Sequence, residues 1–435
     1  GCYIETDELR GYDPSEDVNE NPAPVEKSVI AEVIGKIKDA KRPVLYAGNG
    51  IRLSEGYGAF RKAVEKLGIP VVTCWDSIDA IEDENPLYVG RGGIMGDRPG
   101  NFAVQNADLV LAVGNRLSIR QVGYSWKTWA REAYVIMVDV DPAELKKTTL
   151  HVELPVCADA KDFFVQMNEQ LADEDVPVFA GKEWIRKCQE WKKNYPVTQP
   201  KHWEEDGKYA NVYAFIKYLS QNLPQGNMTV VSNGSACVVG SHNYVIQKEA
   251  RFLINSAVAS MGYGLPAAIG ACIATGRKTT ICLEGDGSIM MNLQELQTVL
   301  TNQLPIKIFV INNQGYHSIR QTQNNLFKEH CKIGIGPESG DLSFPDFSKL
   351  SEAFGYTYLE AHSNAQMKKM VDQALKIDGA VFCEIFVSAE QNFEPKSATK
   401  RLEDGTLVSP PLEDLAPFLP REEIIKNMFI PVIEE

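Results

Sequence analysis

Short apolar runs alternate with amphipathic stretches along most of this chain, and the alternation predicts parallel sheets covered by helices. Thr279–Glu284 and Ile306–Ile311 are continuous apolar runs of the kind that form buried strands. Between them, Ser288–Gln303 carries apolar residues at positions 293, 296, 299 and 300, which is the spacing of one helix face. A strand, a helix and a strand in this order form a βαβ unit with parallel strands.

The same alternation occurs earlier in the chain and predicts a second sheet domain. The expected strands are Arg42–Ala47, Ile69–Thr73, Ala107–Val113 and Tyr134–Val140, and the expected helices are Val25–Ala40 and Gly56–Leu67. A further helix should begin after Asp141, because an Asp followed by Pro142 is a typical helix start. The predicted fold class is therefore α/β, with two doubly wound parallel-sheet domains.

Composition shifts divide the chain into five parts. We expect a short strand and a linker rich in Pro, Asn and acidic residues in 1–20, and a first domain in 21–175. A charged helical connector in 176–209 should lead to a second domain in 210–395. The Pro-rich, charged remainder, 396–435, is expected to be an extended tail on the surface or over a cleft.

Polar side chains stand at the ends of the two strands named first. Asp286 lies in a Gly-Asp-Gly-Ser turn after one strand, and Asn313 follows the next strand 27 residues later. In parallel sheets both strand ends open onto one edge, so the oxygens of Asp286 and Asn313 should meet there. Mg²⁺ prefers such oxygen ligands and is usually held together with substrate phosphates. Gly-Asp-Gly alone is as often an ordinary turn, but Asn313 at this spacing favours a metal–diphosphate site.

The small residues of this turn suit a phosphate group. Gly285 and Gly287 leave room for the backbone to approach a ligand, and the helix that begins at Ser288 supplies N–H donors and a positive dipole end.

The chain is acidic, with a formal net charge of −14 and a pI near 5.1. This balance argues against nucleic acid and anionic membrane surfaces as partners. Its nine cysteines show no CxxC pair, so we expect a reducing, cytoplasmic location. The uncharged segment Phe252–Gly276 is long enough to suggest a membrane span, but its glycines, serines and proline favour a buried element.

The stretch Gly285–Tyr316 resembles the thiamine-diphosphate signature of acetolactate synthase-like enzymes, and Ala257–Ala271 resembles the glycine-rich segment under that cofactor. The resemblance implies that Met261 holds the cofactor in a bent shape and that the Ala259 carbonyl accepts a hydrogen bond from its aminopyrimidine. It also implies thiamine diphosphate and Mg²⁺ as cofactors, with Asp286, Asn313 and the Gly315 carbonyl as metal ligands.

Residues 42–150 resemble the central domain of the same enzymes, which in several members carries FAD. Gly48-Asn49-Gly50 after a strand is a weak dinucleotide signal and is more often a turn. By resemblance, Asn115 and Arg116 would contact a flavin nucleotide. Other members bind no nucleotide there, and Arg116 could instead cap a strand end or pair with an acid.

The resemblance implies a reaction on a 2-oxo acid, with pyruvate expected, in which a C–C bond is cleaved and the fragment joined to a carbonyl acceptor. Tyr316 and His317 follow the metal-binding Asn313 and are the candidate catalytic residues. His317 could move a proton at neutral pH, or it could simply bond to the backbone of its own loop.

In this family a further domain, ahead of the central one, binds the aminopyrimidine and supplies an activating glutamate. Gly1–Glu8 resembles the last strand of that domain, so we expect the chain as given to hold a cofactor half-site, which a separate pyrimidine-domain subunit could complete. The resemblance also implies a homodimer or homotetramer. Three alternatives stay open: a catalytically silent cofactor-binding subunit, a simple 2-oxo acid decarboxylase, and a plain nucleotide-binding α/β protein.

Overall fold

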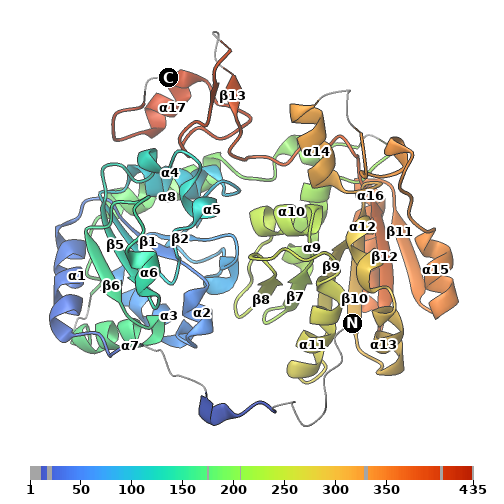
Figure 1. Ribbon diagram of the computed structural model, residues 1–435, viewed down its shortest axis with the longest axis horizontal. Helices are drawn as coiled ribbons and strands as arrows, with labels where there is room; N and C mark the ends of the chain where they lie inside the picture. The colour runs from blue at the N-terminus through green and yellow to red at the C-terminus, as the bar shows by residue number, and fades with distance from the viewer. Residues whose placement is uncertain are drawn as a thin grey trace.

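The computed structural model describes residues 11–16, 22–173, 176–205, 207–327, 332–401 and 405–433. Within these residues the chain forms two six-stranded parallel sheets, each flanked by helices (Figure 1). The predicted fold class, α/β with two doubly wound parallel-sheet domains, is confirmed. The strand expected within residues 1–8 lies outside the described residues.

The first sheet has the strand order β3-β2-β1-β4-β5-β6. The strands β2 and β3 are added on one side of β1 and the strands β4, β5 and β6 on the other, so the switch point of the sheet lies between β1 and β4. Its strands are β1 (Pro43–Ala47), β2 (Val71–Thr73), β3 (Tyr88–Arg91), β4 (Leu109–Val113), β5 (Tyr134–Asp139) and β6 (Leu154–Cys157). Its helices are α1 (Lys27–Asp39), α2 (Gly50–Leu53), α3 (Tyr57–Leu67), α4 (Arg98–Asn106), α5 (Ile119–Val122), α6 (Pro142–Leu145) and α7 (Ala160–Gln170). All residues of β1 and β4 are buried, which explains their continuous apolar sequences.

α8 (Lys182–Asn194) lies in the predicted connector and packs on the first domain. Its Trp184 and Trp191 enter the first core, where their rings meet edge to face at 5.6 Å. The connector therefore contributes directly to the stability of this domain.

The second sheet has the order β11-β12-β10-β9-β7-β8. Its strands are β7 (Met228–Val231), β8 (Arg251–Ile254), β9 (Thr280–Gly285), β10 (Ile306–Asn312), β11 (Thr357–Ala361) and β12 (Val381–Phe386). The helices α9 (Val212–Asn222), α10 (Ser235–Asn243) and α16 (Asn364–Lys376) pack on one face, and α11 (Gly264–Ala274), α13 (Glu295–Thr301) and α15 (Phe347–Phe354) pack on the other. The strand β8 lies on one side of β7 and the strand β9 on the other, so the switch point of this sheet lies between β7 and β9. Ligands bind in α/β sheets at such a point.

The helix predicted over Ser288–Gln303 is wrong as one continuous element. The segment forms the short helix α12 (Asp286–Ile289), a 3₁₀ turn at Met290–Asn292 and then α13. At the turn, Asn292 Nδ2 donates a hydrogen bond of 2.8 Å to the Gly262 carbonyl. This contact with a distant loop holds the break, and a helical spacing of apolar residues carries no sign of it.

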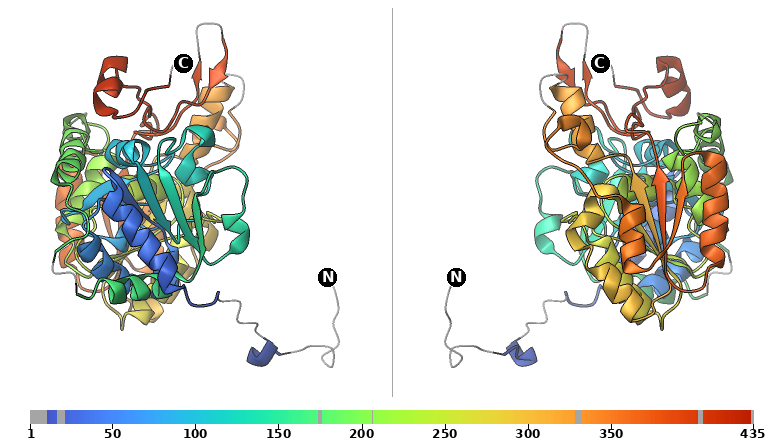
Figure 2. Two further views of the ribbon diagram at one scale, coloured as in Figure 1. Left: turned by 90° about the vertical axis from the view of Figure 1, so that its left-hand side faces the viewer. Right: turned by 90° about the vertical axis from the view of Figure 1, so that its right-hand side faces the viewer.

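The C-terminal segment returns from the second domain to the first (Figures 1 and 2). It contains the two-stranded pair β13 (Lys400–Arg401) and β14 (Leu407–Val408), followed by α17 (Arg421–Asn427). The buried carboxylate of Glu413 pairs with Arg131 at 2.9 Å, and Trp191 donates to Asn427 Oδ1 at 2.7 Å. Leu412, Leu415 and Ile424 of this segment belong to the first core, whereas the sequence predicted an extended tail on the surface or over a cleft.

A buried carboxylate links the two domains. Asp79 follows β2, and its Oδ2 accepts hydrogen bonds from Arg251 Nε at 2.8 Å and from the Phe252 amide at 3.1 Å, both in β8. Arg52 approaches the other oxygen at 3.5 Å. The start of β8 is thus bonded to the first domain.

The remaining sequence expectations concern cysteines and membrane spans. All seven cysteines within the described residues are free, and only Cys157 is exposed. Among the described helices none has the length and apolarity to cross a membrane. The uncharged segment Phe252–Gly276 forms most of β8, a loop and the 11-residue helix α11.

Candidate active site

A cavity of about 110 Å³ opens at the carboxyl ends of β7, β9 and β10. Nine of the predicted site residues line it, namely Met261, Gly285, Asp286, Gly287, Ser288, Asn313, Gly315, Tyr316 and His317. The helices α10, α12 and α14 (His317–Leu326) begin at its wall, so their free N–H groups and positive dipole ends gather there. Such an arrangement favours an anionic ligand.

Asp286 is the buried acid of this cavity. Its Oδ1 accepts from the Gly287 amide at 2.8 Å, and its Oδ2 accepts from the Gly315 amide at 2.9 Å. Burial raises the pKa of Asp286 to about 7, although these amides and the nearby Arg320 act in the opposite direction. A cation at the carboxylate would offset the cost of burying its charge.

Asn313 lines the same cavity as Asp286, and its side-chain oxygen is available to a ligand. Its Nδ2 donates to Ser235 Oγ at 3.0 Å, while the buried Oδ1 has no hydrogen-bond partner among the described residues. Buried amide oxygens without a partner are rare. A metal ion would supply the missing interaction, so the site fits Mg²⁺ by the chemistry of its oxygens.

Arg320 stabilises the loop that carries Asn313. The side chain is 1% exposed, and its guanidinium donates to the carbonyls of Asn313 at 3.1 Å and Gln314 at 2.7 Å. Glu338 accepts from Arg320 Nε at 2.8 Å. Arg320 is thus a buried brace of this loop and is shielded from solvent.

Two glycines of the site have no room for a side chain. A Cβ on Gly287 would lie 2.3 Å from the Tyr316 ring, and one on Gly315 would lie 1.7 Å from the Ile335 carbonyl oxygen. Gly315 also has a φ of 140°, which disfavours other residues. Tyr316 therefore packs directly on the Gly-Asp-Gly turn. At positions 287 and 315 the wall of the cavity consists of backbone atoms alone.

The glycine-rich segment meets the cavity from the other side. Ser288 Oγ accepts from the Gly262 amide at 2.9 Å and shares a hydrogen bond with Ser232 Oγ at 2.7 Å. Met261 is exposed at the cavity mouth. The Ala259 carbonyl already accepts from Asn233 Nδ2 at 2.6 Å, so one lone pair is left for another donor.

Sequence reasoning missed Asn233 and Ser235, which line the cavity from the loop after β7. The signal was the polar run Ser232–Ser235 directly after an apolar strand, the same pattern that identified Asp286. Their partners, Ala259 and Asn313, lie far away in the sequence and could not be inferred from it.

His317 is buried at the start of α14. Its Nε2 lies 2.6 Å from the Gln391 carbonyl, so Nε2 carries the hydrogen and Nδ1 is an acceptor without a partner among the described residues. Burial, with the positive charges of Arg320 and Lys396, lowers the pKa of His317 to about 4. The imidazole is therefore neutral at physiological pH, and its hydrogen bond goes to a distant backbone carbonyl and not to the backbone of its own loop, which was the alternative to proton transfer.

The candidate residues of the first domain gather at a different edge. The loops after β1 and β4 touch there, since a Cβ on Gly48 would lie 2.1 Å from the Gly114 carbonyl oxygen. Asn115 is buried and donates to Cys74 Sγ at 2.9 Å. Arg116 is exposed and pairs with Glu144 at 2.8 Å, one of the two roles left open by the sequence.

The donor set at Asp286 is incomplete by itself. Among the described residues, no three His, Cys, Asp or Glu side chains form a group that could hold a metal. An ion at Asp286 would therefore need amide and carbonyl oxygens from residues 313–315 together with ligand oxygens, as Mg²⁺ bound with a diphosphate has.

Fold and site thus define an α/β protein with a cavity that favours an anionic ligand at the switch point of its second sheet. Comparison with known families gives two matches: residues 30–167 match "Thiamine pyrophosphate enzyme, central domain", and residues 232–385 match "Thiamine pyrophosphate enzyme, C-terminal TPP binding domain". The chain belongs to the thiamine pyrophosphate enzymes, as the resemblance implied.

Similar curated proteins are acetolactate synthase large subunits. The large subunit of Cyanidium caldarium is 30% identical over 83% of this chain and 60% of its own length. Isozyme 2 of Escherichia coli (strain K12) is 30% identical over 86% of this chain and 65% of its own. A probable chloroplastic acetolactate synthase 2 of Oryza sativa subsp. japonica is 30% identical, over 89% and 58% respectively. The chain thus spans about three fifths of these relatives.

Proposed function

We propose that this chain binds thiamine diphosphate and Mg²⁺ in the cavity at Asp286 and acts on a 2-oxo acid, with pyruvate as the expected substrate. The reaction would cleave the bond to the carboxylate and join the remaining fragment to a carbonyl acceptor. The observation that carries the proposal is the unpartnered Oδ1 of Asn313 beside the buried carboxylate of Asp286. The acetolactate synthase names of the relatives support the carboligation step.

In this proposal the protein binds and orients while the cofactor, when bound, supplies the electron sink for decarboxylation. Asp286, Asn313 and the Gly315 carbonyl would hold the metal, and the beginnings of α10, α12 and α14 would bind the diphosphate. Met261 and the Ala259 carbonyl would contact the rest of the cofactor. The remaining lone pair of Ala259 supports that role.

We assign His317 and Tyr316 to the substrate side of the cavity. Because His317 is neutral and its Nε2 hydrogen is occupied by Gln391, Nδ1 would accept a hydrogen bond from a substrate hydroxyl or a water. Tyr316 would fix the position of the Gly287 turn and present its hydroxyl beside the site.

We further propose that a pyrimidine-binding unit of a separate subunit covers the cavity, and that the chain itself forms a homodimer or homotetramer. The family reaction needs an activating glutamate, and no glutamate lies among the described residues that line the cavity. Val258, Met261 and Ile319 are apolar side chains exposed beside the opening, a pattern typical of a covered surface. Light scattering with and without cofactor tests for a homodimer or homotetramer.

Calorimetry and turnover test this function in two steps. Thiamine diphosphate should bind the purified chain with Mg²⁺ and fail to bind with a chelator present. Pyruvate is then added. Acetolactate from the chain alone would contradict the need for a covering unit, carbon dioxide with acetaldehyde would indicate a simple decarboxylase, and binding without turnover would indicate a cofactor-binding subunit. Absence of Mg²⁺-dependent binding would refute the proposal.

A flavin in the first domain is a second candidate. It is supported by the strand order of that sheet, with Gly48, Gly50 and Gly114 in contact at the reversal point, where dinucleotides bind in such folds. Asn115 and Arg116 would border the nucleotide. Flavin absorbance in the pure protein, or its gain on adding FAD, tests this assignment. The free cysteines further support our assignment to the cytoplasm.

A further inference from the structure

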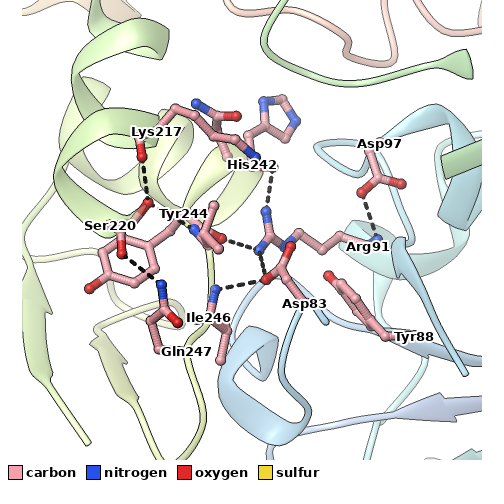
Figure 3. A network of polar contacts seen from close by, with 12 residues as sticks. Asp83, Tyr88, Arg91, Asp97, Lys217, Ser220, His242, Tyr244, Ile246 and Gln247 are labelled. Carbon is pink, nitrogen blue, oxygen red and sulfur yellow. Dashed lines mark hydrogen bonds and ion pairs between the residues drawn. The ribbon is translucent and has the colours of Figure 1, made fainter. Parts of the chain in front are cut away.

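A second cavity, of about 170 Å³, lies between the two domains and away from the cofactor cavity. Arg91, from the end of β3, and Lys192, from α8, line it on the side of the first domain. Lys217, from α9, and His242, from α10, line it on the side of the second (Figure 3). Asp83 and Asp97 also line it, so the wall holds the cations of Arg91, Lys192 and Lys217 and two carboxylates.

Arg91 crosses from one domain to the other. Its side chain is buried, and its two terminal nitrogens donate to the carbonyls of His242 and Tyr244 (Figure 3). Asp83 approaches at 3.7 Å. The remaining donor, Nε, is buried without a partner among the described residues. A buried guanidinium N–H that bonds to nothing calls for a ligand or a water.

Lys217 brings a charge that has no direct ion-pair partner among the described residues, although the nearby Asp83 attracts it. Figure 3 shows its side chain extending from α9 toward His242 and Arg91. Within the described residues no hydrogen bond or ion pair joins its ammonium group. Burial lowers the pKa of Lys217, which means that the charged ammonium is costly there.

The neighbouring carboxylates are already engaged. Asp83 Oδ2 accepts from the Ile246 amide at 2.7 Å. Asp97 begins α4 and accepts from the amides of Gly100 at 2.7 Å and Arg91 at 2.9 Å. Neither carboxylate bonds to Lys217, so the excess positive charge between the domains is not balanced from within the described chain.

Lys192 and His242 complete the wall in different ways. Lys192 Nζ donates to the carbonyls of Asp83 at 2.5 Å and Tyr88 at 3.2 Å and is therefore satisfied. Burial, together with the charge of Arg91, lowers the pKa of His242 to about 3, so its ring is neutral. Hydrogen bonds with the backbone of Met95 and Gly96 act in the opposite direction, so the ring is engaged with the first domain.

We propose that this interdomain cavity binds a small oxyanion of the phosphate type. Lys217 and Arg91 Nε would donate to its oxygens. A water could satisfy one donor but could not balance the charge of Lys217, whereas an oxyanion does both. Since Arg91 belongs to the first domain and Lys217 to the second, the bound anion would join the two domains directly.

Inorganic phosphate is the probe, titrated into the full chain by calorimetry at constant ionic strength, with chloride as the background salt. The cofactor cavity is saturated with thiamine diphosphate and Mg²⁺, so that its diphosphate site is closed to phosphate. We expect saturable binding of phosphate and a rise in Tm. Lys217→Met should weaken phosphate binding at least about tenfold, or about 1.4 kcal/mol. The control Lys349→Met removes an exposed ammonium of α15 and should change nothing.

The relative thermal stabilities of the wild type and Lys217→Met, measured with and without phosphate, provide an independent readout. Without phosphate, Lys217→Met should be as stable as the wild type or more stable, because it removes an unpaired buried charge. With phosphate, the wild type should be the more stable protein. Lys217→Arg keeps the charge and should retain binding. Thiamine diphosphate affinity should stay within about twofold in all three variants, so a failure here is distinguishable from a failure of the proposed function.

Three results would overturn the proposal. These are no saturable phosphate binding, equal binding by wild type and Lys217→Met, and competition between phosphate and cofactor for one site. Acetate replaces phosphate in a parallel titration. Tighter binding of acetate than of phosphate would assign the cavity to a carboxylate and would likewise contradict a phosphate-type site.

Discussion

The Gly315 amide donates a hydrogen bond of 2.9 Å to Asp286 Oδ2, and this bond joins the loop after β10 to the loop after β9. The two loops are consecutive βα connections of the second sheet, and their strands are paired neighbours. Asp286 therefore organises the loop 313–315 through the backbone, independently of any ligand. Its carboxylate acts as a structural acceptor and as the only charged candidate ligand among the residues that line the cavity.

Asp286→Asn removes the charge at nearly constant shape; its single amide oxygen can still accept from Gly315, and the bond from the Gly287 amide is then lost. We expect Mg²⁺-dependent binding of thiamine diphosphate to weaken at least about a hundredfold, or about 2.7 kcal/mol, since the charge for the metal is lost. Calorimetry at several Mg²⁺ concentrations measures it. Asp372→Asn, an exposed residue of α16, is the control. Unchanged binding by Asp286→Asn would place the metal elsewhere.

Gly287→Ala tests the close approach of Tyr316. The added Cβ would lie 2.3 Å from the ring, so the turn or Tyr316 must move. We expect a loss of about 1–3 kcal/mol in unfolding free energy and weaker cofactor binding. In the double variant Gly287→Ala/Tyr316→Ala, the clash is gone and the cofactor affinity should recover. No recovery would show that the backbone, not the ring, requires glycine.

Gly270→Ala is the matched control for that substitution. Gly270 lies within α11, and nothing stands within 4 Å of its added Cβ. An alanine in a helix interior is favoured over glycine by about 0.5–1 kcal/mol, so this variant should be slightly stabilised.

Much of the fold could be predicted because fully buried parallel strands have continuous apolar sequences. β9 and β10 are such strands, and the polar residues at their ends mark the site directly. Strand β11 has exposed and half-buried positions, and its mixed sequence predicted no strand. The local sequence pattern therefore predicts buried strands such as β9 and β10, and it fails for the half-exposed edge strand β11.

The rest of the site depends on contacts between distant segments. Arg320 braces the carbonyl of Asn313, and Asn233 bonds to Ala259, yet neither pairing has a signature in the local sequence. The same reason explains the break in the helix predicted over Ser288–Gln303, which a contact with Gly262 holds. The binding roles of Asn115 and Arg116 remain predictions.

Arg320→Met tests the brace of the metal loop. It removes a buried guanidinium that holds two loop carbonyls and pairs with Glu338, so we expect a loss of about 3 kcal/mol in unfolding free energy. Cofactor affinity should fall as well, although Arg320 does not line the cavity. Chemical denaturation and calorimetry measure the two effects. Arg186→Met, on α8, is the control. Unaltered cofactor affinity would reduce Arg320 to a stabilising role.

Asp79→Ala tests the link between the domains. The variant leaves Arg251 and the Phe252 amide without their acceptor, and we expect a loss of about 2–3 kcal/mol. Because β8 carries both partners, hydrogen exchange should increase first in β8 and in the loop before it. Asp39→Ala, at the exposed end of α1, is the control. Exchange that increases uniformly over both domains would argue against a local link.

The change of the unfolding free energy with pH in the acidic range should depend on Glu394. A hydrogen bond from His202, at 3.2 Å, and the charge of Lys201, at 2.5 Å, lower the pKa of Glu394 to about 2, from an ordinary value of 4.5. Because the folded pKa is the lower one, this pairing stabilises the protein above about pH 4.5 and is lost as the pH falls toward about 2. Partial exposure limits the gain to about 1 kcal/mol.

Glu394→Gln removes the titrating group and should flatten that part of the profile. We expect the wild type to be more stable than the variant near neutral pH and the two to converge as the pH approaches 2. Urea midpoints at a series of pH values measure the difference. Glu390→Gln, an exposed neighbour, should follow the wild type throughout. Two parallel profiles would mean that Glu394 contributes through packing alone, since only a titrating pair makes the difference depend on pH.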